Sequence, residues 1–394
     1  MSRSNTAHSY GAVAKTFHWL TALLIITLIA LGIIANGMAY DTSEQLALKA
    51  WLFSMHKTLG VTMFFVALAR IGWALSQPKP NGLHPERRAE SWLAETIHWL
   101  LYGSLVLVPL TGWIHHASTT GFAPIWWPFG QNLPFVAKSE GTADLFAGLH
   151  IIFERVLAAS ILLHVAGALK HHFIDKDATL RRMWFGASNA PETTGNHNAV
   201  LPIASAFVAW AAALMIGTAI GVFDHADGQD RAALEDVASD WTVTSGEIAI
   251  TIDQFGSTVT GSFEDWTASI IYNPTTGMGS TEVTIAVGSL TLGSVTSQAL
   301  GPDFFDTATF PTAVFTADLA PIVDGNMATG TLLIRDKTVP IEMPFNLSTT
   351  DDVTTMRAEI KLNRLDFDIG KNMADESSLK FPVKVQITLT ATQN

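Results

Sequence analysis

The chain has 394 residues, enough for two or three domains; 48% of them are hydrophobic and only 15% are charged. It contains no cysteine, which excludes disulfides, thiolate catalysis, Fe–S clusters, cysteine-based zinc sites and covalently attached c-type haem. The net charge of −12 is unevenly shared, with +3 on residues 1–199 and −15 on residues 200–394. Neither half holds a basic cluster suited to nucleic acid, and the contrast predicts two different environments.

Five apolar stretches in the first 223 residues are long enough to cross a bilayer as helices. We expect these spans at Phe17–Ala39, Leu52–Leu75, Ile97–Ala117, Leu145–Leu169 and Val200–Phe223. The first is too long for the apolar region of a signal peptide and lacks a small-residue cleavage site. The chain is therefore expected to be a membrane protein without a cleaved leader.

The distribution of Lys and Arg predicts how these spans are oriented. Most of these basic residues lie before the first span, between the second and third spans or after the fourth: Arg3, Lys15, Lys79, Arg87, Arg88, Lys170, Lys176, Arg181 and Arg182. The opposite loops hold only Lys49, Lys57 and Lys138. The positive-inside rule then places the N-terminus in the cytoplasm and everything after the fifth span outside.

Histidines inside the spans need the most explanation, because ionisable groups in a membrane are costly and usually functional. The predicted orientation places His18 and His164 near the inner surface, and His56 and His150 near the outer surface. His150 and His164 are fourteen residues apart, or about 1,400° of helical rotation, so they share one face about 21 Å apart along the axis. The fourth span therefore offers one ligand near each membrane surface. A histidine from another span lies at each of these depths, His18 at the inner one and His56 at the outer one.

Haem accounts for this pattern better than a metal ion does. Histidines on facing helices commonly hold a cofactor in a bundle, whereas a zinc site takes three or four protein ligands. Two axial imidazoles leave no open position on the iron, which favours electron transfer. A role as helix–helix hydrogen-bond partners explains a single histidine but not four at paired depths. We predict two non-covalent b-type haems, one between His18 and His164 and one between His56 and His150.

Residues 8–183 resemble the bacterial cytochrome b561 family. The resemblance rests on KTFHWL around His18, MHKTLG around His56, GLH ending at His150, and LHVAGALKHHF around His164. The ligands of the family fall on the same two histidine pairs. The resemblance implies an electron-transfer oxidoreductase of the bacterial inner membrane with a ubiquinone-type quinone as partner. For some members it implies superoxide oxidation at the periplasmic face.

Several residues near these depths are candidates for supporting roles. Arg155 is a candidate partner for a haem propionate, with pairing to Glu154 as the alternative. His171, at the inner mouth, is a candidate for neutralising propionates or passing protons to quinone; the alternative is a basic helix end at the lipid headgroups. Three other histidines have open roles: His98, His115 and His116. They are candidates for substitute haem ligation, for quinone or proton chemistry, or for a position at an interface. For His116 the interface position is favoured.

The second half of the chain changes from helical to strand patterning. Apolar residues alternate with polar ones, as at Ala358, Ile360 and Leu362, in roughly ten short runs separated by turn residues. This predicts an all-β antiparallel barrel or sandwich. We expect a four-helix membrane domain at 1–183, a cytoplasmic linker at 184–199, a fifth helix at 200–223, a periplasmic linker at 224–238 and the β domain at 239–394.

Residues 239–393 resemble the YceI-like family of periplasmic, lipocalin-like isoprenoid-binding proteins. The matching segments are DWTV from Asp240, VTGSFEDW from Val259, DFFD…FPTAVF from Asp303, GTLLIRDKTVPI from Gly330 and DFDIG from Asp366. Where the family usually shows His-Ser after the opening Trp, this chain has Thr244, Ser245 and Gly246. The resemblance implies an apolar ligand, and six aromatic residues are candidates either to line its pocket or to fill the core: Phe263, Trp266, Phe304, Phe305, Phe310 and Phe315.

Three functions follow from these observations. The first is a quinone-linked di-haem electron carrier whose periplasmic barrel holds an isoprenoid quinone. The second is a superoxide:ubiquinone oxidoreductase, although the acidic second half is poorly suited to attract an anion. The third is a membrane-anchored isoprenoid carrier without redox activity, which leaves the four paired histidines unexplained.

Overall fold

The structure is a computed structural model that describes residues 2–84, 86–185, 199–224, 232–235 and 237–394. The chain forms two compact units. One comprises Met1–Gly37, Leu52–Ser118 and Pro124–His225, and the other comprises Met38–Trp51, Thr119–Ala123 and Ala226–Asn394. Both predicted linkers, 184–199 and 224–238, fall largely outside the described residues.

The first unit is helical, as predicted. Five helices are long and apolar enough to cross a membrane: α1 (Ala12–Gly37), α2 (Ser43–Leu75), α3 (Arg88–Ser118), α4 (Glu140–Phe173) and α6 (Val200–Ala219). Helices α1 to α4 begin before the predicted apolar stretches, because a helix can continue into water where polar residues and caps satisfy its end. Ser139, for example, caps α4 by accepting a hydrogen bond from the backbone N–H of Thr142 at 3.3 Å.

An apolar layer holds the four-helix part together between the two histidine depths. Ile25 of α1, Met63 and Ala67 of α2 and Leu105 of α3 are buried there and pack with Ile161 of α4. A short helix, α5 (Thr179–Met183), follows α4 and was not predicted. It lies next to the start of α1, where the Lys15 ammonium donates to the Trp184 carbonyl at 2.7 Å. The start of α1 is thereby linked to the end of α5.

The fifth spanning helix packs closely on the others through glycine. A Cβ added to Gly103 of α3 would lie 2.1 Å from the Trp210 ring of α6, and one added to Gly217 of α6 would lie 2.4 Å from Ile152 of α4. Small residues allow such close approach between helices in a membrane. The fifth helix is therefore a packed member of the bundle rather than a separate tether.

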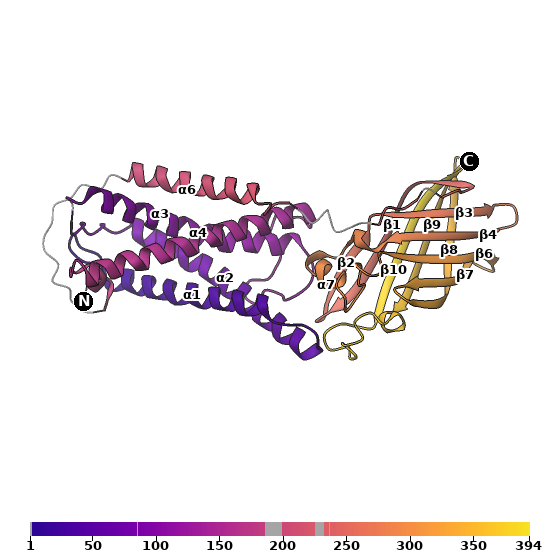
Figure 1. Ribbon diagram of the computed structural model, residues 1–394, viewed down its shortest axis with the longest axis horizontal. Coiled ribbons are helices and arrows are strands. Elements are labelled where there is room, and N and C mark those ends of the chain that lie inside the picture. The colour runs from indigo at the N-terminus through magenta and orange to yellow at the C-terminus, as the bar shows by residue number, and fades with distance from the viewer. Residues whose placement is uncertain (1, 85, 186–198, 225–231, 236) are drawn as a thin grey trace. The chain divides into compact units, whose positions relative to one another are not determined.

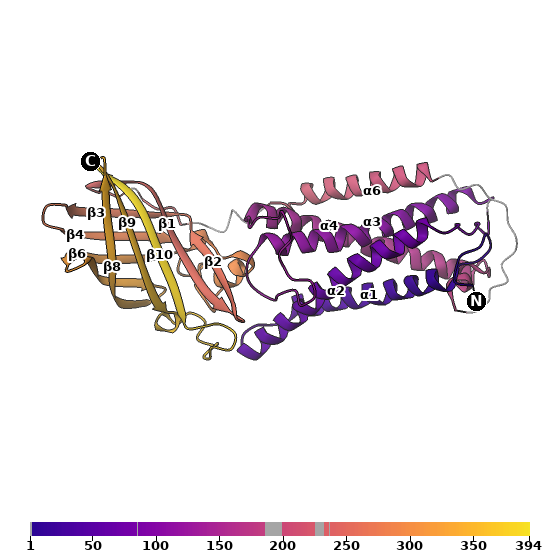
Figure 2. The same cartoon turned by 180° about the vertical axis from the view of Figure 1, so that it is seen from behind.

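The second unit contains a ten-stranded antiparallel sheet that curls into a half-barrel, confirming the predicted lipocalin-like class (Figures 1 and 2). The strands lie in the order β3-β4-β6-β7-β8-β9-β10-β1-β2-β5. Their bounds are β1 Trp241–Gln254, β2 Ser257–Phe263, β3 Trp266–Asn273, β4 Met278–Ala286, β5 Leu290–Thr291, β6 Thr312–Ile322, β7 Gly325–Ile334, β8 Lys337–Thr350, β9 Val353–Asn363 and β10 Pro382–Gln393.

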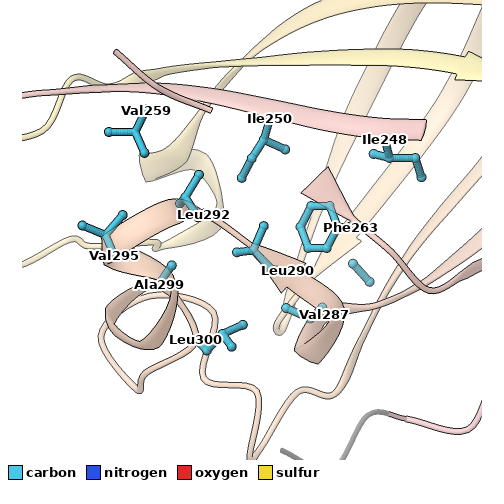
Figure 3. Packing of buried hydrophobic residues seen from close by; sticks show 11 residues of the cluster. Ile248, Ile250, Val259, Phe263, Val287, Leu290, Leu292, Val295, Ala299 and Leu300 are labelled. Carbon is cyan, nitrogen blue, oxygen red and sulfur yellow. The ribbon is translucent and has the colours of Figure 1, made fainter. Parts of the chain in front are cut away.

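Bonds between the two sides of the sheet draw the curl closed. The backbone N–H of Asp240 donates to the Ile270 carbonyl at 3.0 Å, and the Trp241 indole donates to the Tyr272 carbonyl at 3.0 Å. Inside, side chains from β1 and β2 such as Ile250 and Phe263 pack against the segment that contains the short helix α7 (Thr296–Ala299) (Figure 3). Trp241, the Trp at the start of this domain, therefore has a structural role, because its indole N–H joins the two sides of the sheet.

Candidate functional site

The inner histidine pair is brought together by α1 and α4. The imidazoles of His18 and His164 have their ring centres 6.1 Å apart, with 60° between their planes. His98 of α3 also lies beside His164, with ring centres 5.1 Å apart. Three imidazoles therefore converge at this depth, two of them on the helices that the sequence predicted.

The outer pair is held by hydrogen bonds to backbone carbonyls. The Nδ1 of His56 on α2 lies 3.0 Å from the Leu28 carbonyl of α1. The Nδ1 of His150 on α4 lies 2.8 Å from the Val108 carbonyl of α3. A carbonyl only accepts, so in each ring Nδ1 carries the proton and Nε2 keeps its lone pair. Metal-binding histidines usually have such a second partner, which fixes the ring and its tautomer.

Two glycines make room for the outer rings. A Cβ built on Gly112 of α3 would lie 2.9 Å from Nδ1 of His150, and one on Gly32 of α1 would lie 3.2 Å from Cε1 of His56. Any larger residue at these helical positions would displace an imidazole. The glycines are therefore part of the histidine sites, although no pattern in the sequence marks them.

These histidines would suit a b-type haem. The 6.1 Å between the ring centres of His18 and His164 would leave room for a metal between the two rings. At the outer depth, both rings already have the tautomer that leaves Nε2 available. Neutral imidazoles in a helical bundle are the donor set that haem takes.

The remaining membrane histidines are placed differently. His115 Nδ1 lies 2.7 Å from the Ala143 carbonyl, and its ring packs on that of His116, with ring centres 4.5 Å apart. His116 Nδ1 is buried and has no hydrogen-bond partner among the described residues. This pair follows the outer depth on α3 and links α3 to the start of α4.

Arg155 and His171 lie apart from the paired imidazoles. Arg155 is five residues after His150, about 140° around the helix; its side chain is 76% exposed and 3.6 Å from Glu154. His171 Nδ1 lies 2.7 Å from Asp177, beyond the end of α4. A propionate contact for either residue stays a prediction.

The carboxylates beside His171 are kept ionised by their surroundings. A hydrogen bond from Lys170 and another from Arg87 hold the pKa of Asp175 at about 2. Burial raises the pKa of Asp177, but hydrogen bonds from Thr179, His171 and His84 outweigh it and keep that pKa below its usual range. The sequence did not predict this cluster, because its members come from two distant parts of the chain, the segment before α3 and the end of α4 with the residues that follow it.

The curled sheet encloses an apolar cavity of about 260 Å³. Five of the six predicted aromatic residues line it: Phe263, Trp266, Phe304, Phe305 and Phe315. Phe310 is not among the lining residues and instead lies under the Arg335 guanidinium, 5.6 Å from it, because it follows the turn that leads out to β6. These five aromatic residues line the cavity and also pack in the hydrophobic clusters around it.

Polar side chains interrupt the apolar lining, among them Gln254, Gln298 and Arg364. Gln254 is 5% exposed, and its Oε1 has no partner among the described residues; the same holds for Nε2 of Gln298 on α7. Arg364 is 3% exposed, and its N–H groups donate to five backbone carbonyls, those of Ile369, Gly370, Met373, Leu379 and Lys380. The arginine is therefore fully used, whereas the two amides each keep a buried polar atom unpaired.

Comparison with protein families agrees with both halves of this description. Residues 9–186 match the family described as prokaryotic cytochrome b561, and residues 200–391 match the YceI-like domain. The second match begins at α6 and so includes the fifth spanning helix.

Curated relatives match the first half. Cytochrome b561 homolog 2 of Escherichia coli is 30% identical over 190 residues, which cover 46% of this chain and 95% of the relative. A probable superoxide oxidase, CybB, of Yersinia pestis is 27% identical over 175 residues, 44% of this chain and 94% of the relative.

Solved structures match the second half. Burkholderia cenocepacia BcnA is 26% identical, with 37% of this chain and 96% of that chain covered and a TM-score of 0.36. A polyisoprenoid binding domain from Saccharophagus degradans is 14% identical, with 40% of this chain and 99% of that chain covered and a TM-score of 0.32.

Proposed function

Because the chain belongs to the prokaryotic cytochrome b561 family and carries a YceI-like domain in its second half, we propose that it is a di-haem electron carrier of the bacterial inner membrane. It exchanges electrons with a ubiquinone-type quinone. Its C-terminal domain lies in the periplasm and binds an isoprenoid chain. The observation that carries the proposal is the pairing of four membrane histidines at two depths.

Each histidine has a specific task in this proposal. His18 and His164 hold the inner haem, and their ring separation leaves space for one metal between them. His56 and His150 hold the outer haem through Nε2, since Leu28 and Val108 fix Nδ1 as the donor. A b-type haem with two axial imidazoles supplies one-electron transfer. The apolar layer around Ile25 and Met63 excludes water between the two depths.

A haem count with a reduced-minus-oxidised spectrum tests the ligand scheme. Wild-type protein should contain two low-spin b haems per chain, and His164→Ala should retain about one, because only the inner site loses a ligand. His172→Ala, at the exposed end of the same helix, is the matched control and should retain both. Well-folded wild-type protein without haem would contradict the proposal and leave the lipid carrier.

The cavity favours a neutral, oxygen-bearing head group on the barrel ligand. A buried polar atom without a partner costs about 1–3 kcal/mol, so the unpaired atoms of Gln254 and Gln298 favour a ligand that donates and accepts hydrogen bonds. A prenyl phosphate needs a cation, but Arg364 has no free N–H to offer. A quinone accepts a hydrogen bond from Nε2 of Gln298 without added charge, and the hydroxyl of a quinol also donates to Oε1 of Gln254.

Equilibrium binding to the full chain tests this head-group preference. Wild type should bind a short-chain ubiquinone more tightly than a prenyl diphosphate of the same chain length. Replacing both amides (Gln254→Leu with Gln298→Leu) should weaken quinone binding about tenfold, the value of one lost hydrogen bond. Gln386→Leu, on the exposed face of β10, is the matched control. Tighter diphosphate binding in wild type would contradict the quinone assignment.

Superoxide:ubiquinone oxidoreduction is the second candidate, suggested by the name of the Yersinia pestis relative. The outer lysines give it little electrostatic support. Lys49 donates to the Met38 carbonyl at 2.8 Å, Lys138 donates to the Ala117 carbonyl at 2.9 Å, and Lys57 is 8% exposed. Cations held in this way are poorly placed to steer an anion from solution. Superoxide-driven quinone reduction that is lost in His56→Ala would favour this candidate.

A further inference from the structure

A cluster of metal-type donor atoms lies at the inner end of the helical unit, away from the paired histidines. It brings together His84 from the segment between α2 and α3, His171 from the last turn of α4, and Asp177 from the connection to α5. Asp177 Oδ2 lies 3.0 Å from Nε2 of His84 and 2.7 Å from Nδ1 of His171. The three donor atoms all lie within 4.8 Å of one another.

The side chains are already oriented for a shared ligand. The two imidazoles lie nearly parallel, with ring centres 6.1 Å apart and 9° between their planes. Asp177 is fixed because its other oxygen, Oδ1, accepts from the backbone N–H of Thr179 at 2.7 Å. The three side chains are partly or largely buried, with 29%, 22% and 11% of their surface exposed. Two imidazoles and one carboxylate are a donor set that zinc takes in sites with three protein ligands.

Nearby charges leave Asp177 as the carboxylate that is free to bind a cation. Lys170 is paired with Glu90 at 2.8 Å and with Asp175 at 2.9 Å, and Arg87 is paired with Asp175 at 3.1 Å. Asp175 also lies 3.0 Å from His171 Nδ1, so Glu90, His171 and Asp175 form a second candidate set. Its carboxylates are already neutralised by these two cations. Among the described residues, the ion pairs of Asp177 Oδ2 are with the two imidazoles.

Arg181 does not cancel this charge directly. Its guanidinium approaches the backbone carbonyl of Asp177 at 3.4 Å, not the carboxylate. Glu86, on the other side of the cluster, lies 3.3 Å from Nδ1 of His84. A carboxylate there favours Nδ1 as the donor and leaves Nε2 of His84 with its lone pair directed at the cluster. Metal-binding histidines commonly have such a carboxylate partner.

We propose that His84, His171 and Asp177 bind a divalent transition-metal ion of the zinc type through Nε2, Nδ1 and Oδ2. The ion joins the segment before α3 to the end of α4. His171 follows His164 by seven residues, two helical turns along the same face and about 10 Å away. Occupancy of the site therefore fixes the inner end of the helix that carries both haem-depth histidines. The site does not depend on haem being bound.

Zinc binding to the full purified chain in detergent tests the proposal. The protein is stripped with a chelator, titrated with Zn²⁺ against a chromophoric competitor, and its zinc content is counted by mass spectrometry after gel filtration. Wild type should bind one tight zinc ion per chain. His84→Ala, His171→Ala and Asp177→Asn should each weaken binding by about tenfold or more. His172→Ala, one residue along and exposed, should bind as wild type does.

Each other outcome overturns the assignment. Wild type that binds no zinc at micromolar concentrations shows an ordinary hydrogen-bonded cluster. Equal binding by wild type and all three variants places the metal elsewhere. Loss of zinc in Asp175→Asn with retention in Asp177→Asn would assign the ligands to the second set. Gel-filtration profiles without zinc identify a variant that has misfolded, and the two remaining variants then decide.

Discussion

At the residue scale, the chemistry of a side chain decided whether its role could be predicted from the sequence. His18, His56, His150 and His164 were identifiable because an ionisable residue in an apolar span is conspicuous, and their depth follows from helix geometry. Gln254 and Gln298 were not identifiable, because a glutamine in a strand or short helix is ordinary until its burial is known. Aromatic composition also does not distinguish a cavity-lining residue such as Phe304 from Phe310, which is not among the lining residues.

Gly112 gives a residue-scale test of the outer site that leaves its ligands unchanged. Gly112→Ala places a methyl group 2.9 Å from Nδ1 of His150, which must move and lose its bond to Val108. We expect loss of about one haem per chain or a low-spin signal that changes for the outer haem only. Gly32→Ala, with a 3.2 Å approach to His56, should have a smaller effect.

Gly72→Ala serves as the control for this series. A Cβ there meets nothing within 4 Å, so the haem content should match wild type. An alanine in an exposed helix position is slightly stabilising, by up to about 1 kcal/mol relative to glycine. An unchanged spectrum in Gly112→Ala would show that the His150 ring does not occupy the position described here.

At the scale of elements, the sequence predicted the type of each element better than its limits. Apolar length marks the part of a helix inside the bilayer, but α3 starts at Arg88, nine residues before the predicted span, because polar residues there still form helical hydrogen bonds. Strand alternation predicted the inward face correctly at Ala358, Ile360 and Leu362. Strand order depends on pairing between distant segments, which alternation alone does not specify.

The connection between β9 and β10 is an element held by one side chain. Arg364 donates to the carbonyls of Ile369, Gly370, Met373 and Leu379; the Gly370 carbonyl also accepts from the backbone N–H of Met373. Arg364→Met should destabilise the β domain by at least about 3 kcal/mol, since each unsatisfied buried group costs about 1–3 kcal/mol. For a domain of this size that lowers its melting temperature by roughly 10 °C.

Thermal unfolding of the full chain, followed by the β-sheet signal in circular dichroism, measures this effect. Arg357→Met, at an exposed position on β9, is the matched control and should melt within about 2 °C of wild type, because surface substitutions change stability little. A melting temperature of Arg364→Met equal to that of the control would show that the connection is held by other contacts.

At the scale of the whole molecule, an odd number of spanning helices separates the two ends of the chain across a membrane. Five such helices are present among the described residues. In the first half of the chain, most Lys and Arg residues lie at the N-terminus or in the loops predicted to share its side of the membrane. A fifth spanning helix would allow a β domain to follow the bundle on the side of the membrane opposite the N-terminus. Without it, the proposed isoprenoid-binding domain and the outer histidines would lie on opposite faces of the membrane.

The absence of cysteine makes this topology directly testable, since any introduced cysteine is the sole labelling site. Exposed positions are available on both predicted sides: Ser4 near the N-terminus, Lys176 after α4 and Thr275 in the turn between β3 and β4. In intact spheroplasts, a membrane-impermeant maleimide should label Thr275→Cys but neither Ser4→Cys nor Lys176→Cys until the membrane is permeabilised. Labelling of Ser4→Cys with protection of Thr275→Cys would invert the orientation. The β domain would then be cytoplasmic, His18 and His164 would form the outer pair, and the proposed periplasmic exchange with an isoprenoid quinone would be excluded.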